Sequence, residues 1–127
     1  MEALLDTCAL LWLGMGGGEL SPSVRRKIST ADSLYFSSIS AWELSRLQRE
    51  GKVVIPASPE TFLEDLCREY GIDEIPLTRK ILFRTAQLPM HHRDPADRMI
   101  IATALENNLT IVSGDEKFVQ YGVEVVK

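Results

Sequence analysis

Short apolar runs alternate with helical patterns along almost the whole chain, and this alternation limits the possible folds more than any other feature. Strand-like runs occupy residues 3–5, 34–39, 72–75, 109–112 and 123–126. Helical patterns occupy residues 7–13, 22–30, 41–50, 59–70 and 79–87, and another helix begins at residue 94. Strands and helices that alternate in this way form a parallel sheet with helices on both faces. We therefore predict an α/β fold, a three-layer α/β/α sandwich around a central, mostly parallel sheet.

Several helix starts carry local signals. Ser-Pro at 21–22, Ser-Pro at 58–59 and Asp-Pro at 94–95 each place an N-cap residue before a proline at the first helical position. Thr78 is a further N-cap, and glycines at 51 and 71 end two helices. The glycine-rich segment 14–22, GMGGGELSP, lacks the terminal GK and Ser or Thr of a phosphate-binding loop, so we expect a plain loop there.

Length and composition narrow the class of protein. A chain of 127 residues suits one compact domain, so we expect a single domain over residues 1–127. Its 14 Lys and Arg against 18 Asp and Glu give a net charge of −4, which weakens a nucleic-acid interpretation without excluding it. Two cysteines without a CxxC pair, and no apolar run of membrane-spanning length, lead us to expect a reduced, cytoplasmic protein without a membrane partner.

Four acidic residues stand near the predicted carboxyl ends of strands: Asp6, Glu43, Asp97 and Asp115. Asp6 and Asp115 come within three residues of a strand, while Glu43 and Asp97 lie in the first turns of helices. Ligands of a parallel sheet bind outside the carboxyl ends of its strands, near the point where the strand order reverses. We therefore expect all four carboxylates to converge on one edge of the sheet.

Three of the acidic positions in this region have purely structural explanations. Ser40 and Glu43 form a capping box in the sequence SAWE. Asp94 before Pro95 is a ready N-cap, and Asp115 in SGDEK suits a turn. Each acid taken alone is thus compatible with an ordinary structural role.

Asp97 is harder to explain in that way. Although an acid in a first helical turn is favoured by the helix dipole, steps of three and four from Asp97 reach Ile100, Ile101, Ala104 and Leu105. Its carboxylate is therefore predicted to lie on the apolar stripe, where an acid is costly unless it is paired or coordinates a cation. Several carboxylates in one cleft repel each other unless a divalent cation neutralises them, and oxygen ligands without thiolates suit Mg²⁺ or Mn²⁺. Such a cluster is typical of phosphodiester or phosphoryl chemistry.

The motifs LLDTCALLW, SSISAWEL, RDPADRMIIATA and IVSGDEKF occur in this order over essentially the whole chain. Together they resemble the PIN domain and, within it, the VapC toxins of bacterial toxin–antitoxin pairs. Each motif alone is weak, but the ordered set is specific. The resemblance implies a parallel sheet between helices and an acidic pocket that binds Mg²⁺ or Mn²⁺ and hydrolyses RNA.

The resemblance also implies roles for individual residues. Catalytic and metal-binding roles fall on Asp6, Glu43, Asp97 and Asp115, and supporting roles on Thr7 and Ser113. From the residues themselves we expect two further supporting roles, for Asp94, which caps the helix that carries Asp97, and for Arg98. Glu43 is expected either to ligate metal, directly or through water, or to accept a proton. Arg98 is expected to contact RNA or to pair with a pocket acid. Cys8 stands where the family often has Asn, Ser or another small residue, and the glycine run is unusual, but neither departure affects the metal site.

Partners follow from the same resemblance, which implies a homodimer and a cognate VapB-like antitoxin that inserts an Arg or Lys into the pocket. Candidates for an RNA-binding groove are Arg46, Arg49, Lys52, His91, His92, Arg93 and Arg98, although a solvated helix face is the alternative for the first three. We expect the two histidines to lie in a solvent-exposed loop rather than to ligate metal, because hard cations prefer oxygen.

Other functions remain open. The main alternative is a non-catalytic, PIN-like binding module whose acidic pocket docks a basic peptide. A haloacid-dehalogenase-like phosphatase needs a second Asp two residues after Asp6, and Cys8 stands there. A receiver domain needs a pair of acids at the end of its first strand, and Asp6 stands alone.

Overall fold

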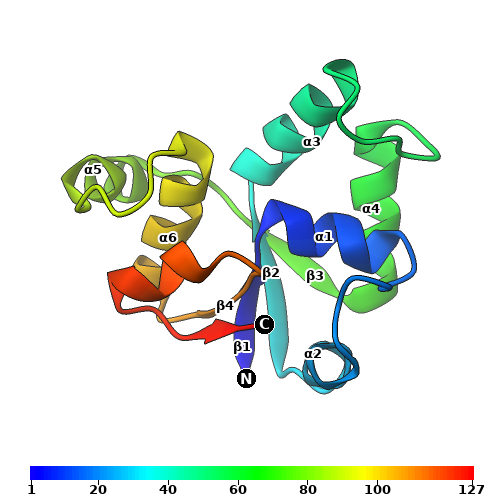
Figure 1. Ribbon diagram of the computed structural model, residues 1–127, viewed down its shortest axis with the longest axis horizontal. Helices are drawn as coiled ribbons and strands as arrows, with labels where there is room; N and C mark the ends of the chain where they lie inside the picture. Colours follow the sequence, from blue (N-terminus) through cyan, green and yellow to red (C-terminus); the bar gives the residue numbers. More distant parts are fainter.

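Five parallel strands form the central sheet in the order β3-β2-β1-β4-β5 (Figure 1). They are β1 (Glu2–Leu5), β2 (Ser33–Ser37), β3 (Ile72–Ile75), β4 (Thr110–Val112) and β5 (Val125–Val126). The structure, a computed structural model, describes residues 1–127. It confirms the predicted α/β fold, and every strand pair is parallel. The order of the strands reverses between β1 and β4, so a ligand crevice is expected at their carboxyl ends.

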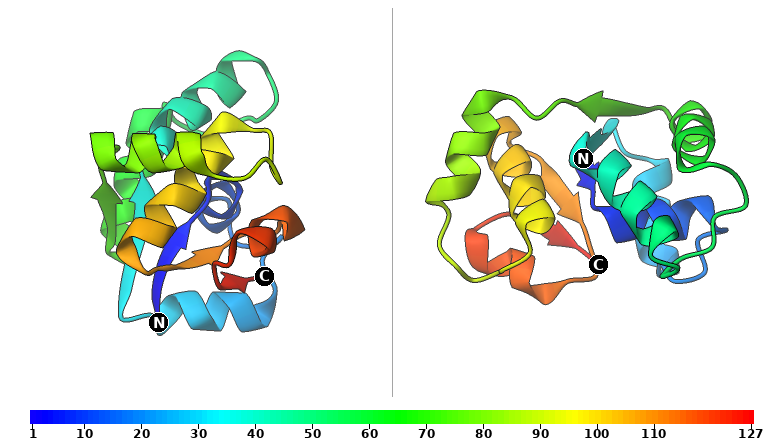
Figure 2. Two further views of the ribbon diagram at one scale, coloured as in Figure 1. Left: turned by 90° about the vertical axis from the view of Figure 1, so that its left-hand side faces the viewer. Right: turned by 90° about the horizontal axis from the view of Figure 1, so that it is seen from above.

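Helices cover both faces of the sheet (Figure 2). They are α1 (Thr7–Gly14), α2 (Pro22–Ser29), α3 (Ile39–Arg49), α4 (Pro59–Tyr70), α5 (Arg79–Gln87), α6 (Pro95–Asn107) and a 3₁₀ helix, η1 (Glu116–Tyr121). On one side of the sheet lie α1, α2 and α4. On the other side lie α6 and η1, and α5 packs against α6. Between the two layers, α3 contacts both α4 and α6. None of these helices is both long and apolar enough to cross a bilayer.

The buried residues of β1 divide the core into two parts. Ala3 and Leu5 belong to a cluster with α1, α2 and α4, whereas Leu4 belongs to a second cluster with Ile100 and Phe118. Successive side chains of a strand point to opposite faces, and a parallel strand between two helical layers is buried on both. This explains why Ala3, Leu4 and Leu5 are consecutive and all apolar.

The predicted helix starts are confirmed by their caps. Ser21, Ser58, Thr78 and Asp94 each accept a hydrogen bond from the backbone N–H three residues ahead. Each of these bonds satisfies an N–H that has no partner within the helix. The Asp94 cap determines where α6 begins, and thereby where Asp97 lies.

The predicted boundary after the second strand was wrong. The strand ends at Ser37 rather than at residue 39, and α3 already begins at Ile39. Ser40 therefore lies inside the helix, and the expected capping box between Ser40 and Glu43 does not form. The residue at the N-cap position, Ser38, donates its hydroxyl hydrogen to Glu74 on β3 instead.

Candidate active site

Asp6 follows β1 directly, at the point where the order of the strands reverses. Its Oδ1 accepts a hydrogen bond of 2.8 Å from the backbone N–H of Ala9, so Asp6 is also the N-cap of α1. The residue is buried. This cap keeps the carboxylate at the carboxyl edge of the sheet, as the sequence predicted.

Glu43 reaches the same edge from α3 and is also buried. The hydroxyl of Thr7 donates to Glu43 Oε1 at 2.5 Å, and Ser40 Oγ lies 2.9 Å from the Thr7 hydroxyl oxygen. Because the only hydroxyl hydrogen of Thr7 points to Glu43, Ser40 is the donor in the second bond. Arg46 lies 3.8 Å from Glu43 Oε2. Ser40, which is buried one turn before Glu43, therefore donates to Thr7 and does not cap the helix; Thr7 in turn donates to the carboxylate of Glu43.

Asp94 and Asp97 lie together at the start of α6. Asp94 Oδ1 accepts a hydrogen bond of 3.0 Å from the backbone N–H of Asp97. Carboxylate oxygens of Glu43, Asp94 and Asp97 lie within 4.8 Å of one another. Asp94 therefore both caps the helix, as predicted, and contributes a carboxylate to the acidic group.

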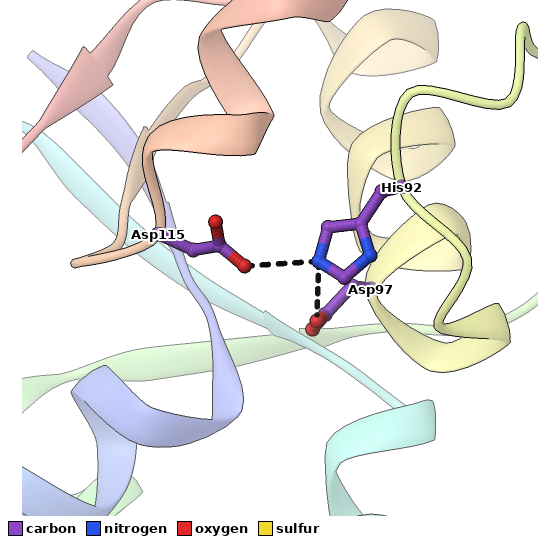
Figure 3. A group of neighbouring side chains, drawn as sticks. All are labelled: His92, Asp97 and Asp115. Carbon is purple, nitrogen blue, oxygen red and sulfur yellow. Dashed lines mark hydrogen bonds and ion pairs between the residues drawn. The ribbon is translucent and has the colours of Figure 1, made fainter.

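Asp115 completes a second group with Asp97, and the third member is His92 (Figure 3). Nε2 of His92 lies 2.9 Å from Asp115 Oδ2 and 3.0 Å from Asp97 Oδ2. The expectation of a solvent-exposed loop was wrong for His92, which is buried, and correct for the exposed His91. Only contacts distant in sequence reveal this burial, since the His92 ring packs against Phe118.

Ser113 and Thr7 lie where the resemblance placed them, beside the fourth and first acids. Ser113 is buried, and its hydroxyl oxygen accepts a hydrogen bond of 3.0 Å from the backbone N–H of Asp115. Asp115 Oδ1 in turn accepts from the N–H of Lys117 and caps η1. The predicted turn role of Asp115 and its place in the acidic site are therefore both present.

Arg98 neither pairs with a pocket acid nor faces solvent. Its buried guanidinium donates to the backbone carbonyls of Thr85, Leu88 and Pro89 at 2.8 to 3.0 Å. Both predicted contacts, to RNA and to a pocket acid, are therefore replaced by a structural one. Asp97 and Arg98 are neighbours on α6 and point to different surroundings.

Electrostatics favour a cation at this edge. Burial, and then the nearby acids Asp94, Glu43, Asp6 and Asp115, raise the pKa of Asp97 to about 8. Burial raises the pKa of Asp6 to about 6, and it also raises the pKa of Glu43, although the hydrogen bond from Thr7 opposes this. Removing a carboxylate from water and placing it beside like charges both favour its protonated form. Full ionisation of the group therefore requires positive charge nearby.

The donor set fits a hard divalent cation. Asp97 belongs to both groups, so carboxylate oxygens from α3, α6 and the loop after β4 surround one region. Asp6 belongs to neither of these groups, but its charge raises the pKa of both Asp97 and Glu43. Oxygen donors without thiolates suit Mg²⁺ and Mn²⁺. Partial burial of the Cys8 thiol, together with the four nearby acids, raises its pKa to about 11, so it is a poor thiolate ligand.

The expected basic residues are distributed around this region. Arg49, Lys52 and Arg93 are exposed, whereas Arg46 lies over the ring of Trp42 and pairs with Glu50 at 2.6 Å. Of the residues expected to form an RNA groove, Arg49, Lys52, His91 and Arg93 are therefore exposed.

One known protein is similar to this chain in sequence, and chains of solved structures are similar to it in fold. Ribonuclease VapC22 of Mycobacterium tuberculosis (strain ATCC 25618 / H37Rv) is 28% identical over 115 residues, which cover 90% of this chain and 87% of that protein. VapBC2 from Rickettsia felis, bound to a DNA fragment from their promoter, contains a chain that superimposes with a TM-score of 0.74 at 16% identity, covering 99% of this chain and 98% of the other. DNA-bound VapBC from Salmonella typhimurium gives a TM-score of 0.71 at 18% identity, covering 99% and 97%.

The profile of the PIN domain family matches residues 3–124, from β1 to the residue before β5. This chain therefore belongs to the PIN domain family.

Proposed function

We propose that the protein is a divalent-metal-dependent ribonuclease that acts as the toxin of a toxin–antitoxin pair. The convergence of Asp6, Glu43, Asp97 and Asp115 at the point where the strand order reverses is the observation that carries this proposal. The likeness to Ribonuclease VapC22 and to chains of VapBC complexes supports RNA as the substrate and the toxin as the biological role.

We propose Mg²⁺ or Mn²⁺ as the cofactor, held by Asp6, Glu43, Asp97 and Asp115. A bound ion of this kind lowers the pKa of a coordinated water and neutralises charge on the scissile phosphate. Asp97 is the central ligand, because it belongs to both acidic groups. Whether one or two ions bind depends on whether these two groups act separately.

The protein groups around the carboxylates have distinct tasks in this proposal. Thr7 aligns Glu43, which serves either as a ligand or as the acceptor of a proton from the attacking water. Asp94 fixes the first turn of α6 and so the direction of Asp97. Ser113 and the N–H of Lys117 hold the backbone and the carboxylate of Asp115.

RNA has to approach an acidic site, and an exposed cation beside it makes this feasible. Arg93 is exposed one residue before Asp94; farther away, Arg49 is exposed at the C-terminal end of α3 and Lys52 three residues beyond it. Contacts of such side chains with phosphates position a nucleic acid without reading its sequence. The surface therefore supports backbone binding beside the carboxylates.

Partner proteins are part of the proposal. Phe83 and Met90, on α5 and in the loop after it, are 68% and 67% exposed, and Trp42 on α3 is 55% exposed. Large exposed apolar side chains are typical of interaction surfaces, so we propose a homodimer that buries some of them. The free cysteines fit a reducing compartment, and we place the protein in the cytoplasm.

A separate groove fits the antitoxin. It has a volume of about 560 Å³ and lies between α3, α4 and β3, with Phe36, Leu63 and Ile72 among its apolar residues. Glu60 and Glu64 contribute acid to its lining. An amphipathic segment with basic residues is complementary to such a groove, and a Lys or Arg from the same partner would bind the acidic site by charge-assisted hydrogen bonds.

The test is an RNA cleavage assay with the purified chain, free of any partner, in Mg²⁺ or Mn²⁺. Cleavage that is abolished by EDTA and by Asp97→Asn supports the proposal. Folded protein that binds Mn²⁺ without cleaving total RNA indicates a narrow RNA specificity, which a panel of defined RNAs resolves. Folded protein that neither cleaves RNA nor binds metal identifies the alternative, a PIN-like module whose acidic pocket docks a basic peptide.

A further inference from the structure

We propose that His92 is a positioning residue that holds the carboxylates of Asp97 and Asp115 together as a hydrogen-bond donor and does not ligate metal. The two acids come from separate elements, the first turn of α6 and the loop after β4. The ring of His92 lies between them (Figure 3). The inference deepens the proposed function, and it rests on that function where it concerns metal binding.

The hydrogen bonds of the ring identify which nitrogen carries the proton. The backbone N–H of Asp94 donates to Nδ1 of His92 at 3.2 Å. A backbone amide is always a donor, so Nδ1 presents its lone pair, and the proton of the neutral ring is on Nε2. Nε2–H therefore donates to Asp115 Oδ2 at 2.9 Å, and Asp97 Oδ2 lies 3.0 Å from the same nitrogen. A ring nitrogen that carries a hydrogen has no lone pair for a cation.

The backbone around His92 is fixed on every side. Its own N–H donates to the hydroxyl oxygen of Tyr121 at 2.7 Å, and that hydroxyl donates to the carbonyl of Pro89 at 2.7 Å. Arg98 holds the carbonyls of Leu88 and Pro89 from inside the protein. The ring itself packs 5.7 Å from Phe118, centroid to centroid. Donors held by their own surroundings position a site more precisely than mobile ones.

The function of this donor follows from the charges that it joins. Two carboxylates that share one region repel each other, and Asp115 lies on a loop, held otherwise through Oδ1 by the N–H of Lys117. The N–H that donates to Asp115, with Asp97 Oδ2 beside the same nitrogen, offsets part of this repulsion and keeps one oxygen of each acid at a set separation. Partners that orient ligating carboxylates in this way typically affect metal affinity by about 10- to 100-fold.

Direct ligation by His92 is the competing arrangement. Nε2 of His92 and the oxygens of Asp97 and Asp115 lie within 4.8 Å of one another, which is close enough for one ion. Ligation through Nε2 requires the proton to move to Nδ1, where it would face the N–H of Asp94. The two arrangements therefore differ in the position of one proton and in whether nitrogen coordinates the metal.

Two variants of the full chain separate the donor from the ring. His92→Gln keeps an N–H donor at a similar reach, whereas His92→Phe keeps a ring against Phe118 and removes the donor. Binding of Mn²⁺ alone is measured by electron paramagnetic resonance of the free ion, with melting temperatures in EDTA to establish folding. We expect His92→Phe to weaken Mn²⁺ binding about tenfold and His92→Gln by less than about threefold. Equal, unimpaired Mn²⁺ binding by both folded variants overturns the proposal.

Spectroscopy of the native protein distinguishes the donor from a ligand. In the Mn²⁺-loaded protein, we expect pulsed electron paramagnetic resonance to show no directly coordinated ¹⁴N. A directly coordinated histidine nitrogen that disappears in His92→Phe overturns the proposal.

The position of the proton can be tested without any metal. In metal-free protein, ¹⁵N NMR of the His92 ring is expected to show a proton on Nε2 and none on Nδ1, and the reverse overturns the proposal. Since this measurement needs neither metal nor RNA, a protein that fails to bind Mn²⁺ would contradict the proposed function while the NMR result still decides the assignment of His92.

Discussion

Thr7 donates its hydroxyl hydrogen to Glu43 Oε1 at 2.5 Å, although the two residues are 36 positions apart in the sequence. This bond joins the first turn of α1 to α3 beneath the carboxylate cluster. It also opposes the rise that burial causes in the pKa of Glu43. The hydroxyl therefore contributes both to the packing of the two helices and to the charge state of the site.

Thr7→Val is expected to destabilise the folded protein. Valine matches the shape of threonine but leaves the buried carboxyl of Glu43 and the hydroxyl of Ser40 without their shared partner. An unsatisfied buried polar group costs about 1–3 kcal/mol. Urea unfolding in EDTA measures this cost, and Thr7→Ser, which retains the donor, should recover most of it. A Thr7→Val protein as stable as the wild type would show that the bond contributes nothing.

Stability of the metal-free protein is expected to fall as the pH rises from about 4 to about 8. Asp6 and Asp97 have ordinary pKa values of 3.8, which folding raises to about 6 and about 8. The folded chain therefore binds more protons than the unfolded chain in this window, and the free energy of unfolding decreases with pH. The stability that Asp6 and Asp97 contribute is fully present below pH 3.8, and it is lost as the pH rises through their raised pKa values of about 6 and about 8.

Melting temperatures in EDTA across this pH range test that dependence. Asp97→Asn should remove the upper part of the decline, near pH 8, and leave the part due to Asp6. Asp32 and Glu106 have lowered pKa values, so their contributions are lost only in acid, as the pH falls below their ordinary values of 3.8 and 4.5. A melting temperature that climbs between about pH 5 and about pH 8 would contradict the raised pKa values.

The sequence predicts the fold well because the relevant signals are local. The consecutive apolar residues of β1 reflect burial on both faces, and the caps of α2, α4, α5 and α6 each depend on a residue only three positions away. The start of α3 was misplaced because SSIS offers serines at 37, 38 and 40. Pairing of Ser37 with Ile75 on β3 determines where the strand ends, and no local pattern encodes that pairing.

The sequence predicts that the acids lie near one edge of the sheet, but it does not predict which other residues surround them. Asp6 directly follows β1 and Asp115 lies three residues after β4, so the topology alone places them near one edge. His92 was missed because its burial depends on Tyr121 and Phe118, more than 20 residues away. Arg98 was misinterpreted for the same reason, since its acceptors are carbonyls of the segment before α6, which side-chain patterns do not reveal.

Arg98→Met is expected to be strongly destabilising. The substitution leaves the carbonyls of Thr85, Leu88 and Pro89 without their charged donor, at a cost of at least about 3 kcal/mol. Arg84→Met is the matched control, because the Arg84 side chain is 41% exposed and ion pairs in contact with solvent, such as the one with Glu106, contribute little to stability. Urea unfolding compares the two variants, and similar losses in both would contradict the structural role of Arg98.

Gly14→Ala is expected to destabilise the protein through a steric clash. A Cβ at this last residue of α1 would overlap Cζ of Phe62 and lie 2.7 Å from its Cε1. Overpacking of this kind costs about 1–3 kcal/mol. Gly18→Ala has open space around its Cβ and an ordinary backbone, so its stability should stay the same or rise slightly. Equal thermal stability of the two variants would contradict the close packing of Phe62 on α1.

The central claim is that the carboxylate cluster binds the metal with which the protein cleaves RNA. The most direct test measures cleavage rate against Mn²⁺ concentration for the wild type, Asp97→Asn and Asp73→Asn. Asp73 is an exposed acid on β3, outside the cluster, and serves as the matched control. We predict that Asp97→Asn abolishes both cleavage and Mn²⁺ binding while Asp73→Asn retains both. Metal-dependent cleavage that survives Asp97→Asn at the wild-type rate and Mn²⁺ dependence would contradict the account.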